Sequence, residues 1–463
     1  MKSRWYHKLI GDKAFYKMVL TVAVPIMIQN GITNFVGLLD NIMVGRVGTE
    51  QMSGVAIVNQ LMVVFNLGIF GAISGAGIFG AQFFGCKDHK GVQHTFRFKI
   101  YICLIILLIG LAVFAGWGED LILLYLHGEG NDVALEQTLY YGKQYLMIML
   151  VGLPPFCVDQ YYSSTLRECG ETILPMKTSI IAVLVNLLLN GILIFGLFGL
   201  PAMGVAGAAL ATVIARYVQA AITIFWTHTH VEKMPFINGV YRSFRIPGTL
   251  VSKILVKGVP LMVNEILWSM GMAVMMQCYS IRGLDIVAGL NISTTITNLF
   301  NVVFVAMGSA ISIIVGQLLG AGKLEEARET DTKLIVSSVI SCLIMGGLLV
   351  VLAPLFPMMY NTTENVKGLA TSLMRVAASL MFMHGFVHAT YFTLRSGGRT
   401  VITFLFDSAC LWCLSIPVAF VLSRYTSIPI VPLYLICQLV DVVKCIIGFI
   451  LVKKGVWIQN LIR

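Results

Sequence analysis

Charged residues are scarce in this sequence. Asp, Glu, Lys and Arg make up 12% of the 463 residues, and 57% of residues are hydrophobic. Soluble globular proteins carry about 25% charged residues, and a soluble core of this length does not hide so much apolar surface. The apolar runs are about 20 to 30 residues long, whereas about 20 suffice for a helix to cross a bilayer. The composition therefore excludes a soluble domain and predicts a helical membrane protein.

Features of enzymes and of ATP-driven pumps are missing as well. The sequence has no nucleophile elbow, no Walker phosphate-binding motif and no soluble domain that would house catalysis. The ten cysteines lie mostly inside apolar runs, where a cysteine usually serves as a small hydrophobe. We therefore predict neither disulfides nor a metal site, and we expect no cofactor. The missing Walker motif also means that any transport by this chain would draw its energy from an ion gradient rather than from ATP.

About twelve apolar runs follow one another along the chain. We expect the transmembrane helices to begin, within a few residues, near Met18, Met52, Phe98, Leu135, Leu174, Ala202, Ile254, Ile286, Leu334, Leu369, Val401 and Ile430.

The net charge of +10 follows the rule that cytoplasmic loops of membrane proteins are basic. With both termini inside and about twelve spans threaded, the outside loops keep only a few basic residues, such as Arg46, Arg282 and Arg424. The basic excess is thus explained by the lipid bilayer, and no nucleic-acid partner is expected. We predict a multi-pass protein of the plasma membrane, here a bacterial inner membrane, with both termini cytoplasmic.

A stretch near the N-terminus occurs again in the second half of the chain. Residues 24–88 align without gaps with residues 259–323 at a shift of 235, with about a dozen identities. A second block, Thr165 to Arg167, matches Thr393 to Arg395 at a shift of 228. In an apolar chain, internal duplication is typical of transporters whose site lies at the repeat interface. We therefore predict an all-α integral membrane protein with about twelve transmembrane helices in two six-helix lobes.

These features divide the chain into four predicted segments. They are a basic cytoplasmic tail (1–17), an N-lobe (18–228), a cytoplasmic linker (229–250) and a C-lobe (251–463). The first apolar run has no small-residue cleavage site, so we expect a retained helix rather than a signal peptide. We expect the protein to be a monomer.

Ionisable residues are costly inside membrane spans and therefore mark candidate sites. Asp40 lies near the outer end of the first predicted helix, above a polar face that includes Asn34. A carboxylate above a water-filled cavity could exchange a proton or hold Na⁺; the alternative is an interfacial carboxylate that reaches water. Asp159 is a weaker candidate. We place its neighbour Gln160, together with Asn34, in the wall of a substrate cavity.

Glu265 is the stronger candidate, in the second half of the chain. It lies a turn and a half past Pro260, which can free a backbone carbonyl for a cation; the alternative is a structurally paired carboxylate. Asp407, in the middle of a later span, could pair with Glu265. Trp268 and Met272 follow Glu265 at plus three and plus seven, and we place both in the cavity wall.

Two other pairs of polar residues occur at helical spacing. His384 and His388 share one face, a spacing that can clamp Zn²⁺, but the third ligand that a zinc site requires is missing. We therefore predict that both line the cavity and that no metal binds. Asp441 and Lys444 are expected to form a structural ion pair near the cytoplasmic end of the last helix.

Gly75 to Gly80 spell GxGxxG, the dinucleotide-binding pattern. The pattern lacks the preceding strand and the acidic residue about 20 positions on. Glycines every three or four residues in a membrane helix favour close helix packing instead, and we predict that role here.

Several short motifs, in order along the chain, resemble the multidrug and toxic compound extrusion (MATE) family. They are Val24-Pro25, Asp40 to Gly45, Gln82 to Gly85, Leu166-Arg167 with Gly170 and Thr172, Asn186 to Asn190, and Pro201 to Thr212. The resemblance covers nearly the whole chain. It implies a twelve-helix antiporter with two six-helix lobes around a central cavity, which exports organic, often cationic, compounds against Na⁺ or H⁺.

The resemblance also implies two cation sites. The N-lobe site would consist of Asp40, Asn186 and Asn190, although many members carry Asp where Asn190 stands. This departure removes one carboxylate from the N-lobe. Glu265 and Asp407 match the acidic residues of the C-lobe site in Na⁺-coupled, NorM-like members. We therefore favour the C-lobe as the coupling site.

Three other functions compete with this interpretation. A flippase for lipid-linked or polysaccharide precursors would be expected to carry a cationic cavity, and the central spans offer few Arg or Lys. A channel would require a filter-like ring motif, which is missing. A membrane-embedded enzyme would be indicated by a paired histidine and acid on one helix, and none is present.

Overall fold

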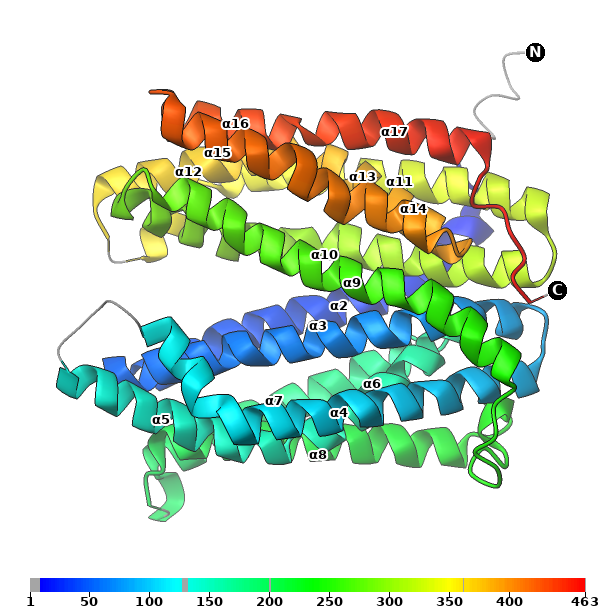
Figure 1. Ribbon diagram of the computed structural model, residues 1–463, viewed down its shortest axis with the longest axis horizontal. Helices are drawn as coiled ribbons and strands as arrows, with labels where there is room; N and C mark the ends of the chain where they lie inside the picture. Colours follow the sequence, from blue (N-terminus) through cyan, green and yellow to red (C-terminus); the bar gives the residue numbers. More distant parts are fainter. Residues whose placement is uncertain (1–8, 127–131, 200, 361, 463) are drawn as a thin grey trace. The chain divides into compact units, whose positions relative to one another are not determined.

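The protein was analysed as a computed structural model, which describes residues 9–126, 132–199, 201–360 and 362–462 (Figure 1). The predicted N-terminal tail thus lies partly outside the described residues. The first half of the chain forms α2 (Lys13–Gly45), α3 (Thr49–Gly85), α4 (His89–Leu126), α5 (Asp132–Val151), α6 (Leu153–Glu168), α7 (Ile173–Phe195) and α8 (Gly204–Thr229). The second half forms α9 (Gly248–Ser280), α10 (Leu284–Gly320), α11 (Leu324–Leu352), α12 (Glu364–Ser379), α13 (Met381–Ser396), α14 (Thr400–Phe404), α15 (Ile416–Tyr425), α16 (Ile430–Leu439) and α17 (Asp441–Lys454).

The predicted class, an all-α membrane protein, is confirmed. Within the described residues, nine helices are long and apolar enough to cross a membrane, or ten if the bent pair α12 and α13 is one span. The twelve predicted starts fall within or next to successive helices, and only Ala202 lies just outside its helix. The two predicted spans that are not among these are α9 and the span divided between α5 and α6.

Some spans consist of two consecutive helices. Thr400–Tyr425 and Ile430–Lys454 each count as one span, and in Figure 1 the paired helices α14 and α15, and α16 and α17, continue in line. The break between α5 and α6 falls at Gly152, and Pro154 lies in the first turn of α6. Proline is tolerated in a first helical turn because its missing N–H would have no intrahelical partner there.

The chain separates into two compact units. One comprises residues 1–27, 81–88 and 254–463, and the other comprises residues 28–80 and 89–253. The main cores of the first unit lie around α10, α11 and α13 and around α10 and α12. The core of the second unit lies among α3, α4, α5 and α8. Helices α2 and α3 each contribute residues to both units.

The internal repeat has a direct counterpart inside the first unit. A Cβ on Gly85 would overlap the backbone of Gln317, and a Cβ on Gly320 would overlap the backbone of Gln82. Gly85 and Gly320 are equivalent in the sequence repeat, and so are Gln82 and Gln317. The contact is therefore reciprocal, as in a two-fold interface where the same surface is used twice. The C-terminal ends of α3 and α10 cross at these glycines.

The C-terminal segment covers this crossing. Trp457 is fully buried, and its backbone packs against Gly397. Gln82 accepts a hydrogen bond from Leu461 N–H at 2.8 Å, and Asn460 Nδ2 donates to the Leu319 carbonyl at 2.9 Å. Residues 457–461 thus contact the ends of α3 and α10 as well as the turn that follows α13.

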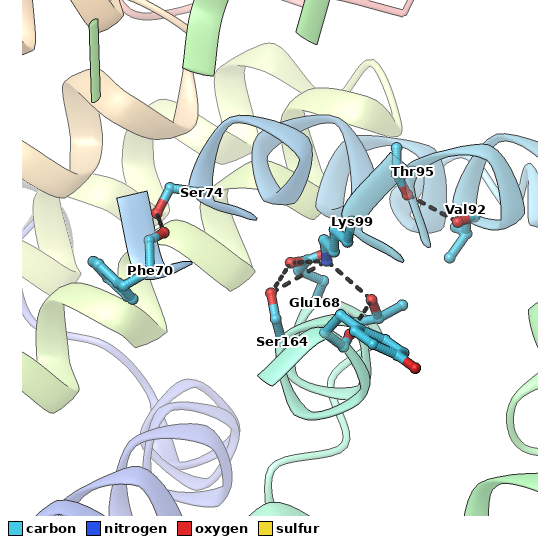
Figure 2. Close-up of polar contacts among 9 residues, drawn as sticks. Phe70, Ser74, Val92, Thr95, Lys99, Ser164 and Glu168 are labelled. Carbon is cyan, nitrogen blue, oxygen red and sulfur yellow. Dashed lines mark hydrogen bonds and ion pairs between the residues drawn. The ribbon is translucent and has the colours of Figure 1, made fainter. Parts of the chain in front are cut away.

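A buried ion pair joins α4 to α6 in the second unit. Lys99 Nζ lies 2.6 and 2.7 Å from the two carboxylate oxygens of Glu168, and Thr165 Oγ1 accepts a further bond at 2.9 Å (Figure 2). Gly77 and Gly80 of α3 face the same carboxylate, and a Cβ on Gly77 would lie 2.8 Å from Glu168 Oε1. The glycines of the GxGxxG pattern therefore permit close packing, as predicted.

Candidate cation sites

The strongest concentration of intramembrane charge lies between α9, α13 and the segment after α14. Tyr391 OH donates to Glu265 Oε1 at 3.1 Å, and Asn264 Nδ2 donates to Asp407 Oδ2 at 3.0 Å. Asn264 also donates to Tyr391 OH at 3.3 Å. Asn264 and Tyr391 therefore connect the two predicted carboxyl groups, which belong to one hydrogen-bonded group. We call this group, with the charged residues described next, the C-cluster.

Residues of α17 and α13 extend the C-cluster. Lys444 Nζ lies 3.7 Å from Asp407 Oδ1 and 3.3 Å from Asp441 Oδ1. Asp441 Oδ2 in turn lies 3.7 Å from His384 Nε2. The predicted pairing of Asp441 with Lys444 is confirmed, but its predicted location is wrong. Both lie in the middle of the span Ile430–Lys454, because the basic end of that span is formed by later residues.

The backbone around Asp407 departs from a regular α-helix. Residues Leu405–Ala409 and Leu411–Ser415 form two π-helical turns. Each such turn adds a residue to the helical repeat and is frequent at functional sites. The second turn contains Trp412, whose Nε1 donates to the Leu267 carbonyl of α9 at 2.9 Å. This bond holds α9 against the segment that carries Asp407.

The predicted N-lobe residues also meet. Asn190 Nδ2 donates to Asp40 Oδ1 at 2.6 Å and to Asn186 Oδ1 at 3.1 Å. Asn186 Nδ2 donates to Thr212 Oγ1 of α8 at 3.1 Å. Asn186 and Asn190 are 6% and 1% exposed, so the amides are sequestered and orient the single carboxyl group of this N-cluster.

The two clusters differ in charge. The C-cluster contains three carboxyl groups, Glu265, Asp407 and Asp441, and two basic groups, Lys444 and the buried Arg395, whose charge acts on Glu265. The N-cluster contains one carboxyl group, Asp40, hydrogen-bonded to an amide. An unpaired charge inside a membrane protein is costly. The surplus of acid over base therefore makes the C-cluster the better site for a cation.

The predicted cavity residues are more scattered. Trp268 and Met272 are 38% and 47% exposed on α9, and Asn34 is exposed on α2. Gln160 is half-buried on α6, one residue past the buried Asp159. None of these four is hydrogen-bonded to either cluster in the part of the chain that the structure describes. Their location in a substrate cavity remains a prediction.

The two histidines occupy different environments. His384 joins the C-cluster through Asp441, whereas His388 packs against Phe304 with ring centroids 4.5 Å apart. Among the described residues, no group of three or more His, Cys, Asp or Glu residues could hold a metal ion. The ten cysteines are free thiols, including Cys410 and Cys413, which stand in Cys-x-x-Cys spacing in the π-helical segment.

Several members of these clusters are not among the sites predicted from the sequence. Asn264, Tyr391 and Thr212 are uncharged, and their role depends on which helices lie opposite them. Lys444 and Asp441 had a usable signal, because intramembrane acids and bases tend to share one site. Their i, i+3 spacing predicted a pair formed by these two residues alone, so the third partner, Asp407, was not predicted.

The fold and the clusters define a class: a duplicated helical membrane protein with sequestered carboxyl groups in each half. The model of the family described as MatE matches residues 25–192 and again residues 260–421. The two matches begin 235 residues apart, which is the shift of the sequence repeat. The chain belongs to the MatE family, whose members are transporters rather than enzymes.

Individual relatives match most of the chain. The probable multidrug resistance protein YoeA of Bacillus subtilis is 24% identical over 418 residues, covering 88% of this chain and 87% of that protein. The probable multidrug resistance protein NorM of Thermotoga maritima is 24% identical over 411 residues, covering 88% and 86%. The solved outward-facing structure of a multidrug resistance MATE family transporter superposes with a TM-score of 0.84 at 19% identity, covering 97% of both chains.

Proposed function

We propose that this protein exports organic, often cationic, compounds in exchange for Na⁺ or H⁺ by alternating access. The observation that carries the proposal is the C-cluster, in which three carboxyl groups outnumber two basic groups, Lys444 and Arg395, inside the membrane-spanning part of the chain. Such a group can hold a cation in one state and release it in another. The relatives named as multidrug resistance proteins support the export of organic compounds.

Coupling requires that the cation binds one conformation more tightly than the other. In our proposal, Glu265 and Asp407 bind the coupling ion, and Asp40 with Asn186 and Asn190 serves as a secondary site. Occupation of the carboxyl groups lowers the affinity for a cationic substrate, because both ligands depend on the same negative charge. The export step therefore follows ion entry.

The remaining expectations belong to the same proposal. We place the protein in the cell membrane as a monomer, with both termini in the cytoplasm and with lobes bounded at residues 18–228 and 251–463. Asn34, Gln160, Trp268, Met272, His384 and His388 would line the substrate path. The flippase alternative is not favoured, because the relatives reported above are multidrug resistance proteins.

Transport by purified protein in liposomes tests the proposal. Efflux of a fluorescent organic cation is measured under an imposed Na⁺ gradient, and separately under an imposed proton gradient. We expect one gradient to drive export, and Glu265→Gln and Asp407→Asn to slow it about tenfold or more, which corresponds to about 1.4 kcal/mol in the barrier. Asp40→Asn should have a smaller effect.

Glu171→Gln is the matched control for these acid-to-amide changes. Glu171 lies outside the clusters, and its Oε1 accepts bonds from the backbone N–H groups of Ile173 and Leu174 at 3.1 Å. A glutamine oxygen can accept both bonds, so export should stay at the wild-type rate. Export that neither gradient drives would refute the proposed function, and full export by both C-cluster variants would refute the site.

A further inference from the structure

The two halves share a hydrogen bond at equivalent positions. In the first half, Gln29 Nε2 donates to Ser179 Oγ at 2.8 Å. In the second half, Asn264 Nδ2 donates to Asp407 Oδ2 at 3.0 Å. The two repeat shifts relate these contacts, because 29 + 235 = 264 and 179 + 228 = 407. The C-cluster therefore has a counterpart in the first half, and this counterpart is centred on Ser179 rather than on the N-cluster.

The counterpart contains its own acid, Asp159 of α6. Gln219 Nε2 donates to Asp159 Oδ2 at 2.9 Å and to Ser179 Oγ at 3.2 Å. Thr223 Oγ1 and Ser163 Oγ donate to Asp159 Oδ1 at 3.0 and 3.3 Å. Ser163 stands at the repeat position of Tyr391, since 163 + 228 = 391. Both halves thus place an amide and a hydroxyl at matching positions, whereas the carboxyl groups differ, because Asp407 corresponds to Ser179 and Asp159 corresponds to Val387.

No basic side chain that the structure describes forms an ion pair with Asp159, and the charge of Arg167 acts on it from a greater distance. Asp159 is 4% exposed, and no Lys, Arg or His lies within ion-pair distance of it in the described ranges. The charged and titratable side chains on the helices around it are Asp40, Arg167, Glu168, Lys177, Arg216 and His228. None of the basic ones forms an ion pair with it.

A second carboxylate on the same helix shows the contrast. Glu168 lies nine residues further along α6, and Lys99 balances its charge at 2.6 Å (Figure 2). The two charges of this buried pair cancel, so Glu168 needs no further cation. Asp159 has three hydrogen-bond donors that favour its charged form, and Arg167, whose charge acts on it, makes no ion pair with it. Asp159 thus keeps carboxylate oxygens that a small cation can contact directly.

The neighbouring oxygen atoms are suitable ligands. Gln29 Oε1 is a buried atom without a hydrogen-bond partner, and the amide of the same residue contacts Ser179. Ser179 Oγ accepts bonds from both Gln29 and Gln219, so its lone pairs fix the two amides in place. Carboxylate, amide and hydroxyl oxygens are the ligands that hard cations prefer.

We propose that Asp159, with Gln29, Ser163, Ser179 and Thr223, binds one monovalent cation, Na⁺ or H⁺. This site is separate from the N-cluster and the C-cluster. It would give the first half of the chain a cation site at the position that the C-cluster occupies in the second half. The binding chemistry does not depend on the proposed function; only a part in transport would rest on it.

Counting bound cations in a background without the other candidate carboxyl groups tests the site. The background is Asp40→Asn, Glu265→Gln, Asp407→Asn, purified in detergent and accepted if it elutes as one species. Equilibrium dialysis with radioactive Na⁺ counts bound Na⁺, and a pH indicator counts protons taken up between alkaline and mildly acidic pH. Adding Asp159→Asn should remove one equivalent of Na⁺ or one of H⁺, and which is lost identifies the ion.

Glu171→Gln, added to the same background, is the control and should change neither count. If the background does not fold, wild type is compared with Asp159→Asn alone, and the same loss of one equivalent is expected. Equal counts with and without Asp159 would overturn the proposal. Failure of the proposed function has a different signature, since wild type would then export no cation under either gradient while the count at Asp159 stands.

Discussion

Lys99 and Glu168 are the clearest structural pair at the scale of single residues. Lys99 is fully buried, and its Nζ also donates to Thr165 Oγ1 at 2.9 Å. Lys99→Met leaves a buried carboxylate without its cation, which should cost about 3–5 kcal/mol of unfolding free energy. Removing both charges with Lys99→Met and Glu168→Met should cost less. Unfolding in mixed micelles, followed by circular dichroism, measures both.

The exposed pair Lys143 and Glu119 provides the comparison. Its Nζ–Oε2 distance is also 2.6 Å, but both side chains are 50% exposed. Exposed ion pairs contribute about 0–1 kcal/mol, so Lys143→Met should barely change stability. If Lys99→Met lowers the unfolding free energy no more than Lys143→Met does, burial does not govern the strength of these ion pairs.

The sequence indicated the charged residues of the C-cluster better than their connections. Glu265 and Asp407 were expected to pair, and they lie in one hydrogen-bonded group. They meet through Asn264 and Tyr391, whose participation depends on tertiary packing and leaves no trace in residue spacing. Ser179 illustrates the same limit, because its correspondence to Asp407 becomes visible only when the bond from Gln29 to Ser179 is compared with that from Asn264 to Asp407.

At the scale of helices, the reciprocal crossing of α3 and α10 predicts that a Cβ added at either crossing glycine lowers stability. Gly85→Ala and Gly320→Ala each place a Cβ on the backbone of the other helix. Each should cost about 1–3 kcal/mol, the usual effect of overpacking. The double variant should cost less than the sum, because one shift of the helices relieves both contacts. The same unfolding measurement in micelles applies.

Gly347→Ala serves as the control for the crossing glycines. Gly347 lies inside α11, and a Cβ there would meet no atom within 4 Å. Alanine is favoured over glycine inside a helix by up to about 1 kcal/mol, so stability should be unchanged or higher. Destabilisation equal to that of Gly85→Ala would show that the crossing is not specially tight.

The helices themselves were largely predictable, whereas their interruptions were not. Each predicted start falls within or beside a helix because an apolar run of this length has few alternatives in a membrane. The break at Gly152 and the 50° bend between α12 and α13 divide segments that the prediction counts as one span each. The π-helical turns at Leu405–Ala409 and Leu411–Ser415 are invisible to periodicity, since a single added residue shifts the pattern without ending it.

At the scale of the whole molecule, the predicted orientation depends on how many spans the chain makes. Cys86 is exposed in the turn between α3 and α4, and Ser427 is exposed between α15 and α16. Nine predicted spans lie between them if α5 with α6 counts as one and α12 with α13 as one. An odd number puts the two positions on opposite sides of the membrane. Two basic residues, Lys87 and Lys90, lie close to Cys86, and they predict that this turn faces the cytoplasm.

Labelling with a membrane-impermeant maleimide tests this orientation. In a variant whose only cysteine is Cys86, intact cells should stay unlabelled, and permeabilised cells should be labelled. In a variant whose only cysteine comes from Ser427→Cys, intact cells should be labelled at once. Removing all cysteines is the control for background reaction. If both positions react in intact cells, one of the divided segments, α5 with α6 or α12 with α13, does not cross the membrane as one span. The two halves would then differ in the number of times they cross the membrane, whereas the sequence repeat predicts the same number for both.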